Sequence, residues 1–250
     1  MKKNIILLFI MVLAFQGYTQ VSGYLGSRIF LSVNGSLTPD YKTYFFDNRY
    51  DSRFKIRTPF SADLNFVASD NLSLGTKFSF GKSSGNFTSV TYDDNYFYSG
   101  IADYQTKFFS IFVEGHRRSS YSVIDNYYRV GLCMASLKNT EYPYTAVSSY
   151  YSNLVSCDFP ETAKVFALGQ KTSMFGIYYE FGNRVPLSNH LLFLYSLSGY
   201  VFPDRGTIYT DANYVRVSNS SSNTFIRDLG KRRVANSNMF NLNFGLTWAF

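Results

Sequence analysis

The sequence predicts an all-β fold, an antiparallel up-and-down barrel of eight strands that cross a membrane. Aromatic residues make up 19% of the 250 residues and charged residues only 16%, which favours strands over disorder or solvated helices. Apolar and polar side chains alternate with a period of two in one segment after another. The segments between the predicted strands are alternately long and short along the whole chain.

The N-terminus has the pattern of a secretory signal peptide. Lys2 and Lys3 form a basic head, and residues 5–15 carry no polar side chain. This apolar run is too short to cross a bilayer as a helix, which needs about 20 residues. We expect residues 1–19 to be removed on export and residues 20–250 to form the barrel domain, with a buried N-terminal helix as the alternative.

Eight segments carry the strand pattern. They are residues 21–35, 55–68, 72–83, 103–115, 123–137, 170–182, 191–202 and 238–250. Alternation is clearest in the last, where one face carries only bulky apolar residues: Phe240, Leu242, Phe244, Leu246, Trp248 and Phe250. A strand of a soluble sandwich alternates in the same way, but its water-facing side usually carries charges. Segments 103–115 and 191–202 are apolar on both faces in places, so their orientation is less clear.

The connections between these strands fall into two classes. The long ones are residues 36–54, 84–102, 138–169 and 203–237, and the short ones are residues 69–71, 116–122 and 183–190. An outer-membrane barrel has this arrangement, with long extracellular loops and short periplasmic turns. Segments 208–217 and 224–226 in the last long loop are candidates for two more strands, so a ten-stranded barrel is the alternative.

On these features the chain resembles the small outer-membrane β-barrel proteins of Gram-negative bacteria. Members of this family end in an aromatic residue preceded by alternate apolar residues, similar to what the barrel-assembly machinery recognises, and residues 240–250 match that pattern. The resemblance implies an outer-membrane location and partners among outer-membrane lipid, lipopolysaccharide and other outer-membrane proteins. The opening residues 23–28 and the aromatic-rich strands look like barrels of the Bacteroidota.

Few residues suggest catalysis or metal binding. His116 and His190 are the two histidines, and the predicted strands place both in periplasmic turns. The known outer-membrane barrel enzymes resemble one another in placing a catalytic His in the outer half of the membrane or at its outer rim. Neither His of this chain is predicted there, so we expect no enzyme activity. We also expect no cofactor and no metal site, because the sequence has no glycine-rich phosphate loop, no carboxylate motif with calcium spacing and only two cysteines. Cys133 and Cys157 are too far apart in the predicted topology for an easy disulfide bridge.

Charged residues on the predicted inward faces are the most informative candidates. They are Arg28, Arg57, Asp63, Lys77, Arg129 and Glu180. The interior of an eight-stranded barrel is just wide enough for its own side chains, and charges held away from bulk water need partners. We expect Asp63 and Glu180 each to contact an Arg or Lys in a network that rigidifies the barrel; a polar path for ions or solutes is the alternative.

The sequence favours a structural or interaction barrel that works through its long outer loops, by analogy as an accessory of a secretion or surface complex. A narrow porin for small solutes is the main alternative, and a barrel enzyme and a soluble secreted β-protein are weaker ones. The basic run Lys231, Arg232 and Arg233 in the last outer loop is a candidate contact for lipopolysaccharide phosphates, or a solvated charge run. The net charge of +7 is only a weak sign of nucleic-acid binding, and we expect no such partner.

Overall fold

The fold is described by a computed structural model over residues 27–40, 55–69, 71–90, 96–116, 125–141, 144–148, 171–204, 230–232 and 234–250. The strands are β1 (Ile29–Asp40), β2 (Lys55–Arg57), β3 (Phe60–Ser69), β4 (Leu72–Val90), β5 (Tyr96–His116), β6 (Asp125–Glu141), β7 (Tyr144–Ser148), β8 (Lys171–Ser188), β9 (Leu191–Val201) and β10 (Asn241–Ala249). The predicted leader 1–19 and the segments 208–217 and 224–226 lie outside the described residues.

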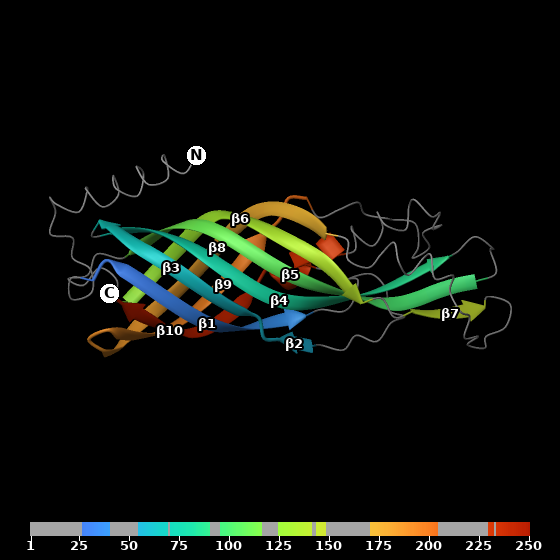
Figure 1. The fold of residues 1–250 in the computed structure, drawn as a ribbon, viewed down its shortest axis with the longest axis horizontal. Helices are drawn as coiled ribbons and strands as arrows, with labels where there is room; N and C mark the ends of the chain where they lie inside the picture. Colours follow the sequence, from blue (N-terminus) through green and yellow to red (C-terminus); the bar gives the residue numbers. More distant parts are fainter. Residues whose placement is uncertain are drawn as a thin grey trace, which may run out of the picture.

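Eight of these strands close into an antiparallel barrel (Figure 1). Their order around the wall is β10-β9-β8-β6-β5-β4-β3-β1, and β10 pairs with β1 to complete the circle. Because β9 pairs directly with β10, the wall has no place for two further strands between them. The predicted eight-stranded, all-β barrel is confirmed, and the ten-stranded alternative is wrong.

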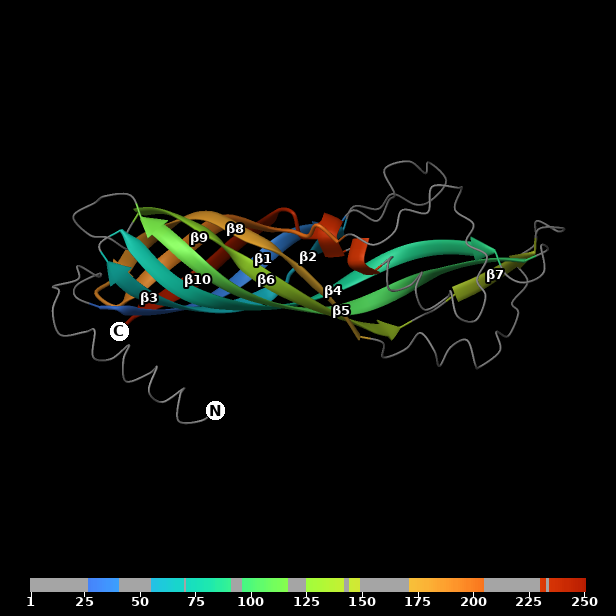
Figure 2. The ribbon, with the colours of Figure 1, turned by 90° about the horizontal axis from the view of Figure 1, so that it is seen from above.

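The two ends of the barrel differ. At the turn end lie the two-residue turn 189–190 between β8 and β9 and the C-terminus. At the extended end, β4 and β5 continue as a long hairpin beyond the wall, and β7 pairs beside β5 (Figures 1 and 2). The prediction of residues 84–102 as a loop is therefore wrong in large part, because the Ser-, Gly- and Asn-rich sequence at 83–86 is held in strand geometry by pairing with β5.

Two predicted strand limits also change. The predicted strand 55–68 is interrupted at Pro59, which lacks the N–H that a strand pairing would use; its carbonyl oxygen accepts a hydrogen bond from the backbone of Ser36 at 2.9 Å. The strand predicted to end at residue 182 continues as β8 to Ser188. The predicted turn 183–190 is thus mostly strand.

Alternation along the strands separates an apolar exterior from a polar interior. On β10, Asn243 and Thr247 are buried inside the barrel, whereas Leu246 and its outward neighbours are exposed. The exposed fraction reaches 75% at Leu132 and 71% at Phe175 on the outer face. A barrel in water would place its apolar side chains inside, so this distribution is the reverse of a soluble fold.

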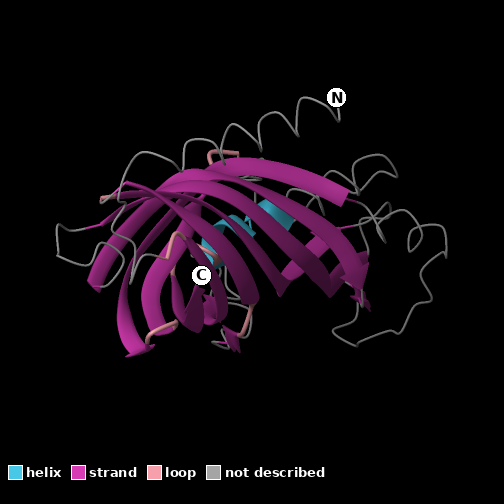
Figure 3. Cartoon of the chain, turned by 60° about the vertical axis from the view of Figure 1, so that its left-hand side comes forward, coloured by secondary structure: helices cyan, strands magenta, loops and turns pink. Residues whose placement is uncertain are grey.

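A short helical segment over residues 230–232 and 234–237 lies within the barrel near the extended end (Figure 3). Val234 and Ala235 of this segment are buried against the side chains of the barrel strands. In the part of the chain that the structure describes, no helix is long and apolar enough to cross a membrane.

Candidate functional site: the charged interior

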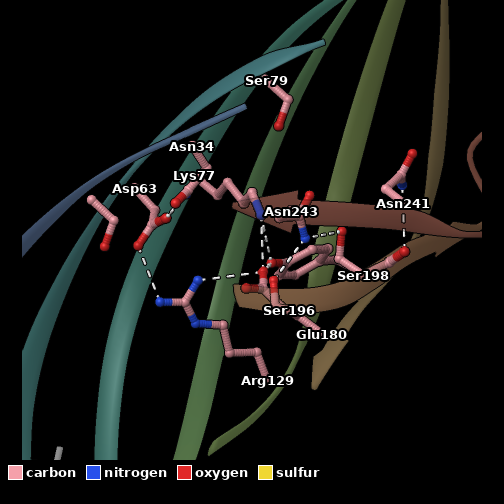
Figure 4. A network of polar contacts seen from close by, with 12 residues as sticks. Asn34, Asp63, Lys77, Ser79, Arg129, Glu180, Ser196, Ser198, Asn241 and Asn243 are labelled. Carbon is pink, nitrogen blue, oxygen red and sulfur yellow. Dashed lines mark hydrogen bonds and ion pairs between the residues drawn. The ribbon is translucent and has the colours of Figure 1, made fainter. Parts of the chain in front are cut away.

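Arg129 is the centre of a buried ion-pair network (Figure 4). It lies near the start of β6, in the half of the lumen nearer the turn end. Its guanidinium lies 3.1 Å from Asp63 Oδ1, 2.5 Å from Glu114 Oε2 and 3.4 Å from Glu180 Oε2. All four side chains are fully enclosed. They come from β3, β5, β6 and β8, so one cation joins four strands of the wall from the inside.

Glu114 is the second hub of this network. Arg184 holds its carboxylate with two parallel hydrogen bonds, Nη1 to Oε1 at 2.8 Å and Nη2 to Oε2 at 2.6 Å, the strongest geometry for this pair. The Asn65 amide donates to Oε1 at 2.8 Å, and His116 Nε2 lies 3.1 Å from the same oxygen.

Sequence reasoning missed both Glu114 and Arg184. Glu114 lies in a predicted strand whose two faces are both apolar in places, so its inward orientation was not assigned. Arg184 lies beyond residue 182, where the strand was predicted to end. The period-two pattern of β8, extended from Glu180 by two inward positions, leads to Arg184.

Glu180 is held by Lys77 and two tyrosines. Lys77 Nζ lies 2.9 Å from Oε2, and the Tyr127 hydroxyl donates to Oε1 at 2.6 Å. The Tyr178 hydroxyl also donates to Oε2, and Lys77 Nζ donates to that hydroxyl oxygen at 3.1 Å. Both oxygens of the Glu180 carboxylate therefore have partners.

Opposite charges in the network are balanced. Its members are Asp63, Glu114 and Glu180 on one side and Lys77, Arg129 and Arg184 on the other. Aromatic rings cover all three cations. Arg129 lies 4.4 Å from the centre of the Phe112 ring, Arg184 4.3 Å from that of Tyr127 and Lys77 5.2 Å from that of Tyr178. Burying an ion costs several kcal/mol unless pairing and hydrogen bonding offset the lost hydration. A balanced network with paired carboxylates meets that condition.

Hydroxyl and amide side chains make further hydrogen bonds at the seam where the barrel closes. Asn34 donates to Asp63 Oδ2 at 2.9 Å. Farther along the seam, Asn243 accepts a hydrogen bond from Ser36 at 2.7 Å and donates to Ser196 at 2.8 Å. These contacts join β1, β9 and β10 across the interior (Figure 4).

A second layer of the interior, toward the extended end, is apolar. Its buried members are Phe108, Phe112, Cys133, Ala135, Leu137, Met174, Tyr178, Tyr200, Phe202, Val234 and Ala235. Phe108 stacks on Tyr200 with ring centres 4.6 Å apart. Gly75 leaves room for the Phe112 ring, because a Cβ there would lie 2.4 Å from it. The helical segment thus packs on an aromatic layer that covers the charged network.

The structure brings four of the six predicted lumen charges into the network: Asp63, Lys77, Arg129 and Glu180. The other two lie at the barrel ends. Arg28 is half-buried at the turn end, where its backbone N–H donates to the Phe250 carbonyl oxygen at 3.0 Å. Arg57 is at the extended end, where its guanidinium donates to the carbonyl oxygens of Lys82 at 2.7 Å and Ser237 at 3.4 Å.

The remaining predicted site residues lie outside this interior network. The C-terminal apolar residues all point outward and are 36–67% exposed: Phe240, Leu242, Phe244, Leu246, Trp248 and Phe250. In the basic run, Lys231 forms a 2.5 Å ion pair with Asp204, and Arg232 is half-buried. Arg233 lies outside the described residues.

Ser73, His116 and Glu114 form a cluster of residue types that can support acyl transfer. His116 Nε2 lies 2.8 Å from Ser73 Oγ and 3.1 Å from Glu114 Oε1. One nitrogen therefore contacts both neighbours, whereas a catalytic triad uses the two nitrogens separately. All three residues are buried, so the cluster is suited to packing and not to attack on a substrate.

The prediction of His116 as a turn residue is wrong, because it ends β5 inside the barrel; His190 does lie in the β8–β9 turn.

Metal-binding geometry is not found in the described part of the chain, where no three His, Cys, Asp or Glu side chains gather suitably. Cys133 is a free, buried thiol on the inward face of β6. Cys157 lies outside the described residues.

The fold and the interior together define the class: a closed eight-stranded antiparallel barrel with a polar, ion-paired interior and an apolar exterior. No protein-family model matches the sequence. No curated protein sequence matches it either.

Several solved structures share the general fold at low similarity. Neisserial surface protein A matches with a TM-score of 0.44 and 7% identity, over 89% of this chain and 97% of its own. Ail, the attachment invasion locus protein of Yersinia pestis, was solved in complex with the heparin analogue sucrose octasulfate. It matches with a TM-score of 0.41 and 9% identity, over 90% of this chain and 97% of its own. The outer membrane protein OprG of Pseudomonas aeruginosa matches with a TM-score of 0.40 and 10% identity, over 93% of this chain and 99% of its own. Similarity at this level carries no functional inference, and the strand pairing of the chain itself establishes the fold.

Proposed function

We propose that this chain is an integral outer-membrane barrel that acts as a structural or interaction protein through its outer end. The observation that carries the proposal is the combination of an ion-paired, aromatic-covered interior with an exterior of exposed apolar side chains. In a bilayer, such an exterior loses its contact with water, whereas in solution an apolar surface of this extent would promote aggregation. The turn end would face the periplasm and the extended end the outside.

The extended end is the part available for interaction in this arrangement. There, β4 and β5 continue beyond the wall and are joined by β7. A rigid barrel with a projecting sheet suits a role in holding a partner at the cell surface, including an accessory role in a secretion or surface complex. The aromatic-rich strands fit a Bacteroidota origin, in keeping with the sequence resemblance.

The competing function is a narrow porin, which the charges in the interior favour. Conductance of the purified full-length barrel in planar phosphatidylcholine bilayers separates the two functions. We expect no steady single-channel current, because the paired charges and the aromatic layer occupy the interior. Regular current steps that depend on the barrel would contradict the structural function and support the porin.

We also propose export through a cleaved leader at residues 1–19 and recognition of the C-terminal apolar face by the barrel-assembly machinery. N-terminal sequencing of the membrane-associated form should begin near residue 20. Removal of Phe250 should reduce assembly in cells but leave refolding of the purified chain into detergent intact. Equal assembly in cells with and without Phe250 would contradict this role.

A further inference from the structure

Four lysines lie on the outward face of the wall close to the extended end. In the strand register, Lys82 of β4 pairs with Gln105 of β5, Gln105 pairs with Lys138 of β6, and Lys138 pairs with Lys171 of β8. Lys107 lies two residues along β5, on the same face as Gln105. All four lysines are exposed. Since neighbouring strands are about 4.8 Å apart, their ammonium groups can converge on one ligand.

The arrangement is unfavourable for the barrel alone. Lys138 and Lys171 are direct cross-strand neighbours, and like charges in such a pair are destabilising. One row beyond the lysines, toward the extended end, Asp103 of β5 pairs with Ser84 and Glu141 in the register. From the row of Lys82 to the turn end, the outward positions described for β4, β5, β6 and β8 carry no Asp or Glu. None of the four lysines forms an ion pair within the described part of the chain. An external anion would offset this repulsion.

The neighbouring surface indicates what else the ligand must contain. Toward the middle of the barrel, the same four strands present a row of apolar side chains: Phe78, Phe109, Met134 and Phe175. The next row contributes Ile111, Leu132 and Ile177. Phe78 and Phe109 lie with ring centres 4.8 Å apart. A soluble anion would leave these rings unused, whereas an acyl chain would cover them.

We infer that Lys82, Lys107, Lys138 and Lys171 bind the phosphate of an anionic lipid in the outer leaflet, with its acyl chains lying on the apolar rows below. Lysine is suited to this role, because its flexible stem lies along apolar surface while its ammonium reaches the headgroup level. The inference rests on the proposed membrane-spanning function. It assigns lipid binding to the wall and not to the predicted basic run 231–233, where Lys231 is already paired with Asp204.

The test uses the full-length barrel in phosphatidylcholine bilayers with a trace of spin-labelled lipid, either phosphatidic acid or phosphatidylcholine with the same chains. The fraction of motionally restricted label measures lipid at the barrel surface. We expect phosphatidic acid to be preferred over phosphatidylcholine, and the preference to weaken with added salt. In the variant K82Q/K107Q/K138Q/K171Q the preference should fall by about tenfold or more, given a severalfold effect of each lysine near an anionic headgroup.

Two control variants separate charge at this site from other effects. The variant K82R/K107R/K138R/K171R keeps the charges and should keep the preference, and K231Q should also keep it. A preference that survives in the quadruple glutamine variant, or that K231Q abolishes, would overturn the inference. Displacement of the labelled lipid by an equal concentration of inorganic phosphate would also overturn it, because it would indicate a site for soluble anions.

Flotation of the same vesicles distinguishes a failure of the proposed membrane-spanning function from a failure of the lipid site. If the barrel does not float with lipid, the proposed membrane-spanning function fails, and the lipid site fails with it. If it floats but shows no preference for phosphatidic acid, only the lipid site is overturned.

Discussion

Arg129 is the single residue on which the interior depends most, because its guanidinium contacts three carboxylates from three other strands. Replacement by Met should lower the free energy of unfolding by about 3–5 kcal/mol, since buried carboxylates lose a shared partner. Urea unfolding of the barrel in lipid vesicles measures this. The matched control is Lys231→Met, whose partly exposed ion pair with Asp204 should contribute only about 0–1 kcal/mol. An Arg129→Met barrel as stable as the Lys231→Met control would contradict the role assigned to Arg129.

Glu114 and Arg184 should be energetically coupled because of their two parallel hydrogen bonds. In a double-mutant cycle, the loss in free energy of unfolding should be smaller for Glu114→Gln combined with Arg184→Met than for the two single changes added together. The difference should be about 1–3 kcal/mol. The control combines Arg184→Met with Asn243→Ala, because Asn243 belongs to the separate seam contacts. The losses in free energy of unfolding from these two changes should add within about 0.5 kcal/mol. Additivity of Glu114→Gln with Arg184→Met would mean that the pair is not a stabilising unit.

Residue identity alone predicted only part of this network. Asp63, Lys77, Arg129 and Glu180 stand in segments of clean alternation, so their inward faces could be assigned. The partners could not, because which side chains meet across the lumen depends on the stagger between strands that are distant in sequence. His116 shows the same limit, since its burial depends on β5 extending one residue beyond the predicted strand.

At the scale of elements, the helical segment at 230–232 and 234–237 should shield the apolar layer and its free thiol, Cys133. Val234→Asp places a charge in this cluster and should displace the segment. Modification of Cys133 by a small water-soluble thiol reagent should then accelerate at least tenfold, measured in a Cys157→Ser background so that one thiol reacts. Lys231→Gln, at the segment's partly exposed start, should leave the rate unchanged. Equal rates in the Val234→Asp and unsubstituted barrels would contradict a sealing role.

The outward faces of the strands should show a cost of charge that depends on depth in the bilayer. Leu132 lies in the middle of β6, and Leu187 lies near the β8–β9 turn; both are exposed outward. Leu132→Arg should destabilise by about 2–4 kcal/mol and Leu187→Arg by about 0–1 kcal/mol. Unfolding in vesicles measures both. Equal costs at the two positions would show that the wall does not cross a bilayer as proposed.

The sequence predicted the strands well where one face is apolar and the other small or polar, as at 238–250. It failed at strand ends. Residues 83–86 have the composition of a loop, yet register with β5 keeps them in a strand. Residues 183–188 also have the composition of a turn. They are nevertheless in β8, which remains paired with β9 almost to the two-residue turn. Backbone pairing between strands sets where each strand ends, and local composition does not report that pairing.

At the scale of the whole molecule, the barrel has two contrasting surfaces and two contrasting inner layers. The exterior is apolar, and the interior combines a balanced ion-pair network with an aromatic cluster closed by the helical segment. Low charge and high aromatic content in the sequence fit this arrangement, since in the proposed bilayer the outward half of each wall strand would face away from water.

The central claim, that this barrel is embedded in a bilayer, is tested most directly by density-gradient flotation of the purified chain refolded with phosphatidylcholine vesicles and washed in high salt. Each fraction is run unheated and heated on a denaturing gel. We expect the chain to float with the lipid and to change mobility on heating, as a folded membrane barrel does. Recovery of folded chain in the lipid-free bottom fractions after the wash would contradict the claim and favour a soluble β-protein.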